Sequence, residues 1–335
     1  MLRTLTTVGL TALIAAPAMA QEVNLYSTRH YDTDLHLYEN FTEATGIQVN
    51  LIEGSGEQLI QRIQTEGVNS PADLYITVDG GRLHRAVEAG VFQPIESAVL
   101  EERVPEAQQH PDNLWFGLTA RARVIFTRSG ERPEWLNDYE DLADPRLEGE
   151  VCIRSSSNIY NISLMAEMID ALGAEAAQEW AAGVANNLAR PPQGGDRDQL
   201  RALAAGECSV AVSNTYYWGA LASSQDPADN EVAAAVEFFY PNQDDRGAHV
   251  NISGAGLTAH APNPENAIRF LEYLVSDEAQ QILADSNNEF PIVPGVEITG
   301  PVAPFTEFNS SGVNVSVYGL NARQATDIFD TVGFP

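Results

Sequence analysis

The sequence predicts a protein of two α/β lobes with a ligand-binding cleft between them. The chain has 335 residues, which is too long for one average core and suits two domains. Strand and helix patterns alternate with short turns from residue 22 to residue 90, and a second α/β region follows residue 129. In open α/β sheets, ligands bind at the carboxyl ends of the strands. We therefore expect the crevice where the strand ends of both sheets face each other.

The first region predicts three strand–helix pairs in a parallel sheet. The expected strands are EVNLYS (22–27), IQVNLIEG (47–54) and PADLYITVD (71–79). The expected helices are 32–46, 55–67, which starts at Ser55 and stops at Gly67, and 80–90. The apolar residues of the first helix are expected on or near one face: Leu35, Leu37, Tyr38 and Phe41.

The second region repeats the alternation with longer helices. Strand patterns lie in GEVCIRSSSNIYN (149–161) and in ECSVAVSN (207–214), and a long helical pattern runs from Ser163 to about Leu188. The segment 251–285 predicts a strand and two helices. Asn263 is expected to cap the first of these helices with Pro264 at its first position, and Ser276 begins the second.

The first twenty residues predict a signal peptide. Arg3 precedes an apolar stretch, and Ala18-Met19-Ala20 forms a small-x-small cleavage site, so the mature chain should start near Gln21. A membrane anchor is the alternative, but the apolar run is short and Pro17 interrupts it. We expect an exported protein that is soluble in the periplasm.

The charge and the composition exclude several classes of function. The formal net charge of −29 disfavours nucleic acid as a partner, because phosphate binding needs a basic face. All 18 basic residues are arginine, which excludes Schiff-base chemistry and a P-loop lysine. We found no nucleophile–base pair of a hydrolase, so an enzyme is not expected.

The two cysteines predict a disulfide. Cys152 and Cys208 each lie in a strand pattern, and an even pair in an oxidising compartment favours a bridge. Two buried free thiols are the alternative.

Four tyrosines lie at the predicted strand-to-helix turns. Tyr31 follows NLYSTRH, Tyr160 follows VCIRSSSNI, and Tyr216 and Tyr217 follow CSVAVSNT. Adjacent side chains in a strand point to opposite faces, so two neighbouring phenols reach one site only where the strand ends. Each tyrosine alone is explained by half-buried packing, but three such turns favour a shared site. Phenolate is a hard anionic oxygen donor and suits a hard trivalent cation such as Fe³⁺.

Charge balance predicts a positively charged side chain near this site. Four phenolates around a trivalent ion leave one excess negative charge, which is costly to bury unpaired. Arg121 and Arg123 are the first candidates to offset it, and Arg29 and Arg154 are weaker ones; surface ion pairs are the alternative for each. His30 is a further ligand candidate or a histidine of the cleft wall.

These segments together resemble the periplasmic ferric-iron-binding proteins of ABC transporters over the whole mature chain. The resemblance rests on the tyrosine-bearing segments together with PADLYITVDGGRLHRAVEAG, TARARVIFTRS and NISGAGLTAHAPNPENAIRFLEYL, and SSSNIYN and NTYY are its most specific motifs. The chain looks most like the iron-uptake branch known from cyanobacteria and marine bacteria.

The resemblance implies a type II periplasmic binding fold, in which two α/β lobes joined by crossing hinge strands close like a transferrin lobe. It implies one lobe from residues 21–119 plus about 249–300 and another from 120–248 plus about 301–335. It also implies Fe³⁺ as the transported ligand, held by Tyr31, Tyr160, Tyr216 and Tyr217, with Arg121 offsetting charge. His30 matches a histidine that ligates in some members only.

The resemblance further implies delivery of the iron to an ABC permease with its ATPase, and we expect the binding protein to be a monomer. The rival reading is a binder of the same fold for an organic solute or oxyanion, such as a polyamine, thiamine or a phosphate ester.

Overall fold

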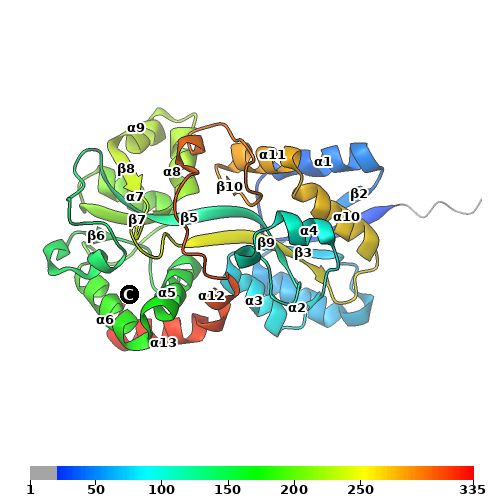
Figure 1. The fold of residues 1–335 in the computed structure, drawn as a ribbon, viewed down its shortest axis with the longest axis horizontal. Coiled ribbons are helices and arrows are strands. Elements are labelled where there is room, and N and C mark those ends of the chain that lie inside the picture. The colour runs from blue at the N-terminus through cyan, green and yellow to red at the C-terminus, as the bar shows by residue number, and fades with distance from the viewer. Residues whose placement is uncertain (1–20) are drawn as a thin grey trace, which may run out of the picture.

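The computed structural model describes residues 21–335, and the predicted signal peptide lies outside the described residues. Figure 1 shows two lobes, with the long strands β5 and β9 running between them. The strands of the described chain are β1 Glu22–Ser27, β2 Gln48–Glu53, β3 Leu74–Val78, β4 Phe92–Gln93, β5 Phe116–Arg128, β6 Val151–Cys152, β7 Val210–Asn214, β8 Val236–Phe239, β9 Val250–Thr258 and β10 Phe290–Pro291.

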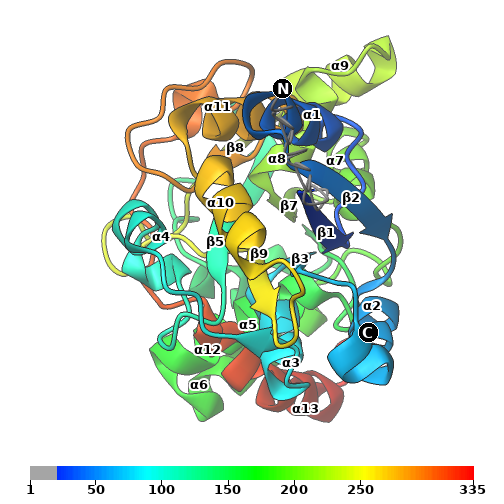
Figure 2. The same cartoon turned by 90° about the vertical axis from the view of Figure 1, so that its right-hand side faces the viewer.

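Helices cover both faces of the strand layer, as Figures 1 and 2 show from two sides. Those of the described chain are α1 Asp34–Thr45, α2 Gly56–Glu66, α3 Gly80–Glu88, α4 Ala98–Arg103, α5 Ile159–Leu172, α6 Ala174–Asn186, α7 Asp196–Ala204, α8 Thr215–Ala222, α9 Pro227–Ala235, α10 Pro264–Leu274, α11 Asp277–Asn287, α12 Ser316–Leu320 and α13 Ala322–Val332. None of the helices between residues 21 and 335 has both the length and the apolar character of a membrane span.

The strand order is β2-β1-β3-β9-β5-β7-β6. The predicted parallel sheet is confirmed for β2, β1 and β3, but β9 joins β3 antiparallel and β5 joins β9 antiparallel. The first half of β5 pairs with β9, and its second half, from Arg123 to Thr127, pairs with β7. One strand therefore belongs to the sheets of both lobes, which makes β5 a hinge strand.

The first three strand–helix pairs agree with the sequence prediction, with one exception in α1. Leu37, Tyr38 and Phe41 are buried, but Leu35 is 43% exposed. Side chains repeat every 3.6 residues around a helix, so Leu35 lies off the stripe that packs on the sheet. The prediction of Leu35 on the core face was wrong.

The long helix predicted from Ser163 to Leu188 is two helices that begin earlier. Helix α5 begins at Ile159, capped by the Asn158 side chain, which accepts from the Tyr160 N–H at 3.1 Å. Gly173, with φ 81°, ends α5 and opens α6. The earlier start places Tyr160 in the first turn of α5.

Asn263 occupies the predicted N-cap position of α10, although its side chain does not cap the helix. Its backbone N–H and its side-chain amide donate to Asp73 instead, at 2.6 and 3.1 Å. Ser276 caps α11 as predicted and accepts from the Ala279 N–H.

The disulfide between Cys152 and Cys208 is confirmed. It joins β6 to the turn that precedes β7, and the buried cysteines lie in the core of that lobe. The alternative of two free thiols is excluded.

Candidate metal centre

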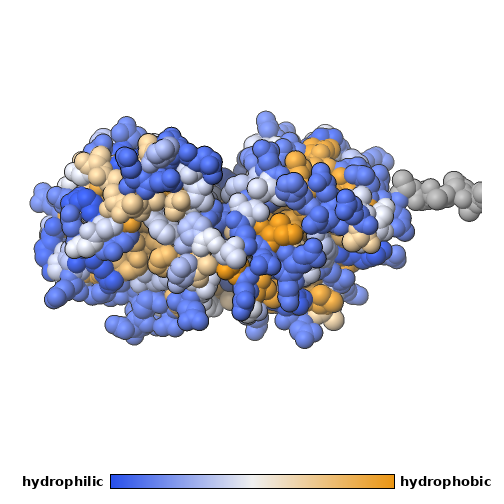
Figure 3. All heavy atoms as spheres, turned by 90° about the horizontal axis from the view of Figure 1, so that it is seen from above, coloured by the Kyte–Doolittle hydropathy of each residue, from blue (hydrophilic) through white to orange (hydrophobic). Residues whose placement is uncertain are grey.

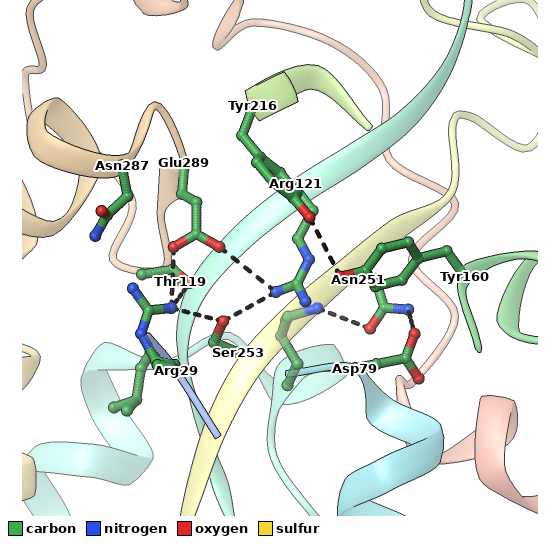
Figure 4. A network of polar contacts seen from close by, with 12 residues as sticks. Arg29, Asp79, Thr119, Arg121, Tyr160, Tyr216, Asn251, Ser253, Asn287 and Glu289 are labelled. Atoms are coloured by element: carbon green, nitrogen blue, oxygen red, sulfur yellow. Dashed lines mark hydrogen bonds and ion pairs between the residues drawn. The ribbon is translucent and has the colours of Figure 1, made fainter. Parts of the chain in front are cut away.

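Three phenols converge from two helix N-termini of one lobe. Strand β7 ends at Asn214 and α8 begins at Thr215, so Tyr216 and Tyr217 lie in the first turn of α8. Their ring centroids are 4.2 Å apart, and the Tyr216 hydroxyl donates to the Tyr160 hydroxyl oxygen at 3.2 Å. The strand end therefore brings two neighbouring phenols and a third from α5 to one place, and Figure 4 shows the contact between Tyr216 and Tyr160.

Tyr31 approaches from the other lobe. It lies between β1 and α1 and is half-buried, and the Arg29 guanidinium carbon is 4.8 Å from its ring centroid. Burial raises the pKa of Tyr31, and the charges of Glu289 and of an ionised Tyr160 raise it further.

Burial also keeps Tyr216 and Tyr217 protonated. It raises the pKa of Tyr216, and the like charges of Tyr160, Tyr217 and Tyr31 add to the rise. The pKa of Tyr217 is raised by burial, by Tyr160 and by Asp196. At neutral pH these empty phenols are therefore neutral, and a cation that binds them as phenolates must displace their protons.

Arg121 lies behind the phenols in a buried network of charges. Its guanidinium donates to the Ser253 hydroxyl at 3.1 Å and lies 3.8 Å from the Glu289 carboxylate. Arg29 donates to the same two groups at 2.8 and 3.0 Å and also pairs with Asp34 at 2.7 Å. Figure 4 shows Glu289 between the two arginines. Both arginines are at most 5% exposed, so a surface ion pair is not their role.

A second buried network lies beneath α5 and α8. Arg123 pairs with Asp196 at 3.0 Å and donates to the side-chain oxygens of Asn161 and Asn214 at 2.6 and 3.1 Å. Arg154 pairs with the other oxygen of Asp196 at 2.9 Å. Because Asn161 belongs to α5 and Asn214 ends β7, Arg123 fixes the two turns that carry the tyrosines.

Asp79 connects the two lobes. It ends β3 and caps α3, and its buried carboxylate accepts from the Ser163 hydroxyl of α5 at 2.8 Å and from the Asn251 amide of β9 at 2.8 Å. Its φ of 81° is rare for a residue other than glycine. A side chain of one lobe thus holds the helix of the other lobe that carries Tyr160.

His30 lies apart from the three phenols of the other lobe. Its side chain is 64% exposed, and its Nδ1 is 3.7 Å from the Glu53 carboxylate. It lines a cavity of about 410 Å³ whose wall includes Glu57, Arg82 and Arg85. In this structure His30 therefore lies beside a carboxylate of its own lobe.

The donor set is phenolic. Within residues 21–335, no group of three or more histidine, cysteine or acidic side chains could hold a metal ion. Clustered phenol oxygens suit a hard, highly charged cation, whereas zinc or copper sites use nitrogen and sulfur ligands. Figure 3 shows a notch between the two lobes, through which such an ion could enter from solvent.

Comparison with known proteins agrees with this geometry. Residues 69–304 match the family described as bacterial extracellular solute-binding protein. The chain belongs to this family. Iron uptake protein A1 of Synechocystis is 50% identical over 319 residues, which cover 95% of this chain and 89% of that protein.

Solved structures of related solute-binding proteins share the whole fold. The Trichodesmium protein IdiA (FutA), in complex with iron and citrate ligands, aligns with a TM-score of 0.91 and 51% identity, covering 94% of this chain and all of that one. Apo FutA2 from Synechocystis aligns with a TM-score of 0.90 and 46% identity, covering 95% and 100% of the two chains. The predicted type II periplasmic binding fold is confirmed.

Three acidic residues of this solute-binding protein's site were missed by sequence reasoning. Asp79, Asp196 and Glu289 are each buried, and each contacts groups far away in the sequence. Asp196 and Glu289 lie in GGDRDQL and NNEFP, which carry no motif. Asp79 follows a strand directly, so its position at a strand end was the one available signal.

Proposed function

We propose that this chain is a periplasmic solute-binding protein that captures ferric iron through tyrosine phenolates and delivers it to an ABC-type permease powered by an ATPase. The convergence of Tyr160, Tyr216 and Tyr217 at two helix N-termini carries this proposal. The iron named for the Synechocystis and Trichodesmium relatives supports the choice of cation. Fe³⁺ is the cargo rather than a resident cofactor.

Tyr31 is the proposed fourth ligand, supplied by the opposite lobe when the cleft closes. The lobes would comprise residues 21–119 plus about 249–300 and residues 120–248 plus about 301–335. The packing of Phe305 against Trp218 and Phe238 supports assigning the last segment to the second lobe. His30 is a possible fifth ligand only if closure turns it away from Glu53. Arg121 lowers the cost of ionising Tyr31 and Tyr216, because its positive charge opposes the rise in the pKa of both phenols, although it shares that charge with Glu289.

Capture requires four protons to leave the phenols as the iron binds. Release could follow reduction, because hard phenolate prefers Fe³⁺ to the less charged Fe²⁺. The binding protein is proposed to act as a monomer in the periplasm after removal of residues 1–20, and no turnover chemistry is expected of it.

The first experiment is a visible absorption spectrum of the mature chain during titration with ferric citrate. A phenolate-to-iron charge-transfer band that saturates at one iron per chain is the expected result. The double variant Tyr216→Phe/Tyr217→Phe should lose the band. Tyr273→Phe is the matched control, since Tyr273 lies on α10 and its hydroxyl has no partner among residues 21–335.

Retention of the full band by the double variant would contradict the ligand assignment. Absence of any band in the wild-type chain, with no change in thermal stability on adding iron, would favour the rival class, a binder of an organic solute or oxyanion. A polyamine site would need carboxylates and aromatic faces in the cleft, whereas these turns offer phenols and arginines.

A further inference from the structure

The two buried arginine networks near the phenols differ in net charge. The first contains two cations, Arg29 and Arg121, and two carboxylates, Asp34 and Glu289. Its formal charge is therefore zero, and Arg121 shares the Glu289 carboxylate with Arg29. Each positive charge of this network is matched by a carboxylate. The network therefore has no excess positive charge with which to neutralise an anionic metal site.

The second network carries one excess positive charge. Arg123 and Arg154 share a single carboxylate, Asp196, which is the one acidic side chain within ion-pair distance of either arginine among residues 21–335. Their remaining partners, Asn161 and Asn214, are neutral. Two cations and one anion leave a formal charge of +1 beneath the tyrosines.

Arg154 is the member of this network that faces the phenols. Arg123 is 1% exposed, and its two terminal nitrogens donate to Asp196, Asn161 and Asn214. The Arg154 side chain is 25% exposed, donates only to Asp196, and has its guanidinium carbon 6.0 Å from the centroid of the Tyr160 ring. The charges of Tyr217 and Tyr160 act on it and raise its pKa, together with Asp196 and against its own burial.

We propose that Arg154 is the cation that offsets the excess negative charge of ferric iron bound by four phenolates. This inference rests on the proposed function. Fe³⁺ and four phenolates sum to −1, and the Arg123–Asp196–Arg154 network supplies +1.

Because of the position of Arg154, the excess positive charge of this network also favours closure of the two lobes. Arg154 precedes α5 in the lobe that carries Tyr160, Tyr216 and Tyr217. Fe³⁺ with these three phenolates is neutral, so the open, iron-loaded lobe keeps the +1 of the arginine network. That charge favours ionisation of the fourth phenol, Tyr31, when closure brings it from the opposite lobe, and the closed site is then neutral.

The test compares Arg154→Gln, Arg154→Lys and the control Arg128→Gln. Arg128 is the last residue of β5, and its side chain pairs with Glu131 and donates to the Cys208 carbonyl oxygen, so the control removes one positive charge away from the phenols. Three quantities are measured: Fe³⁺ affinity by competition with citrate, the reduction potential of the bound iron, and the thermal unfolding midpoint of the iron-free protein.

The Gln variant should bind Fe³⁺ roughly 10- to 100-fold more weakly than wild type, given a charge about 6 Å away in a partly solvated site. Its reduction potential should fall, because the reduced site carries one more negative charge that the arginine no longer stabilises. Arg154→Lys should recover most of both properties. The iron-free unfolding midpoint should match that of Arg128→Gln, since Asp196 keeps Arg123 as its partner.

Affinity and potential in Arg154→Gln equal to those of Arg128→Gln would overturn the inference while leaving the ferric function intact. A wild-type chain without a charge-transfer band would instead contradict the proposed function itself. If the Gln variant unfolds at a lower temperature than the control, the reduction potential of its folded, iron-loaded form still tests the inference. A purely structural role of Arg154 would not change that potential.

Discussion

At the scale of single residues, position in the chain explains the metal site better than residue type. The chain has 11 tyrosines, and the four proposed ligands all lie between a strand and a helix or in the first turn of a helix. Tyr216 and Tyr217 share one site because β7 ends one residue before α8 begins. This local chemistry was predictable, since strand ends and helix starts leave a signature in neighbouring residues.

The partners of the charged residues were not predictable in the same way. Arg29, Arg121 and Arg123 were candidates from the sequence, but Glu289 is 260 residues from Arg29 and Asp196 is 73 residues from Arg123. An ion pair between such distant positions leaves no local pattern in the sequence. Only the folded chain shows which arginines share a carboxylate and which pair with one alone.

His30 should contribute little to iron binding. In His30→Gln we expect a full charge-transfer band and less than a tenfold loss of Fe³⁺ affinity, because the imidazole is exposed beside Glu53. Tyr31→Phe serves as the comparison and should weaken binding far more, since it removes an anionic ligand. Equal losses in the two variants would mean that closure brings His30 into the coordination sphere.

Iron affinity should fall steeply as the pH falls. The raised pKa values of Tyr31, Tyr216 and Tyr217 mean that the empty site holds its protons at neutral pH and binding must release them. Each displaced proton weakens binding by about tenfold per unit decrease in pH. Calorimetry in buffers of different ionisation enthalpy would count the protons, and Tyr217→Phe should release one fewer. Binding without proton release would contradict phenolate ligation.

At the scale of elements, the sequence located β1 to β3 and α1 to α3 but misjudged where the long helical pattern of the second region divides. The pattern from Ser163 to Leu188 is apolar enough for one helix, yet Gly173 in a left-handed conformation separates α5 from α6. Glycine inside a helical pattern is ambiguous, because helices tolerate it at modest cost. The earlier start of α5 at Ile159 matters for function, since it orients Tyr160 toward Tyr216.

The disulfide should support the lobe that carries these helices without taking part in iron binding. Cys152 and Cys208 are 56 residues apart in sequence, and loop closure over that distance contributes up to about 4 kcal/mol. We expect Cys152→Ala/Cys208→Ala to lose about 2–4 kcal/mol of unfolding free energy in urea and to keep one iron per chain at low temperature. Unchanged stability would show that packing alone holds β6 beside β7.

At the scale of the whole molecule, the two lobes communicate through β5, β9 and a small number of side chains. The sequence indicated two lobes but could not show how they are joined, because the contact between them connects Asp79 with Ser163, 84 residues away, and Asp79 is itself held by Asn251 of β9, 172 residues away. These contacts lie at the base of α5, so they link the orientation of Tyr160 to the position of the opposite lobe.

Removal of the Ser163 hydroxyl should therefore change the balance between open and closed lobes. In Ser163→Ala, Asp79 keeps its bonds to Asn251 and to the Gly81 N–H but loses its contact with α5. We expect a larger radius of gyration for the iron-free protein in small-angle X-ray scattering, and a roughly five- to tenfold loss of Fe³⁺ affinity, corresponding to about 1 kcal/mol for a lost hydrogen bond.

The control is Ser213→Ala, since Ser213 is equally buried and its hydroxyl donates to the Asn214 carbonyl oxygen within one lobe. A Ser163→Ala protein with the dimensions and affinity of the control would mean that the hinge strands alone set the lobe positions, whereas a larger radius in Ser163→Ala alone would identify Asp79 and Ser163 as the contact that holds Tyr160 in reach of Tyr31.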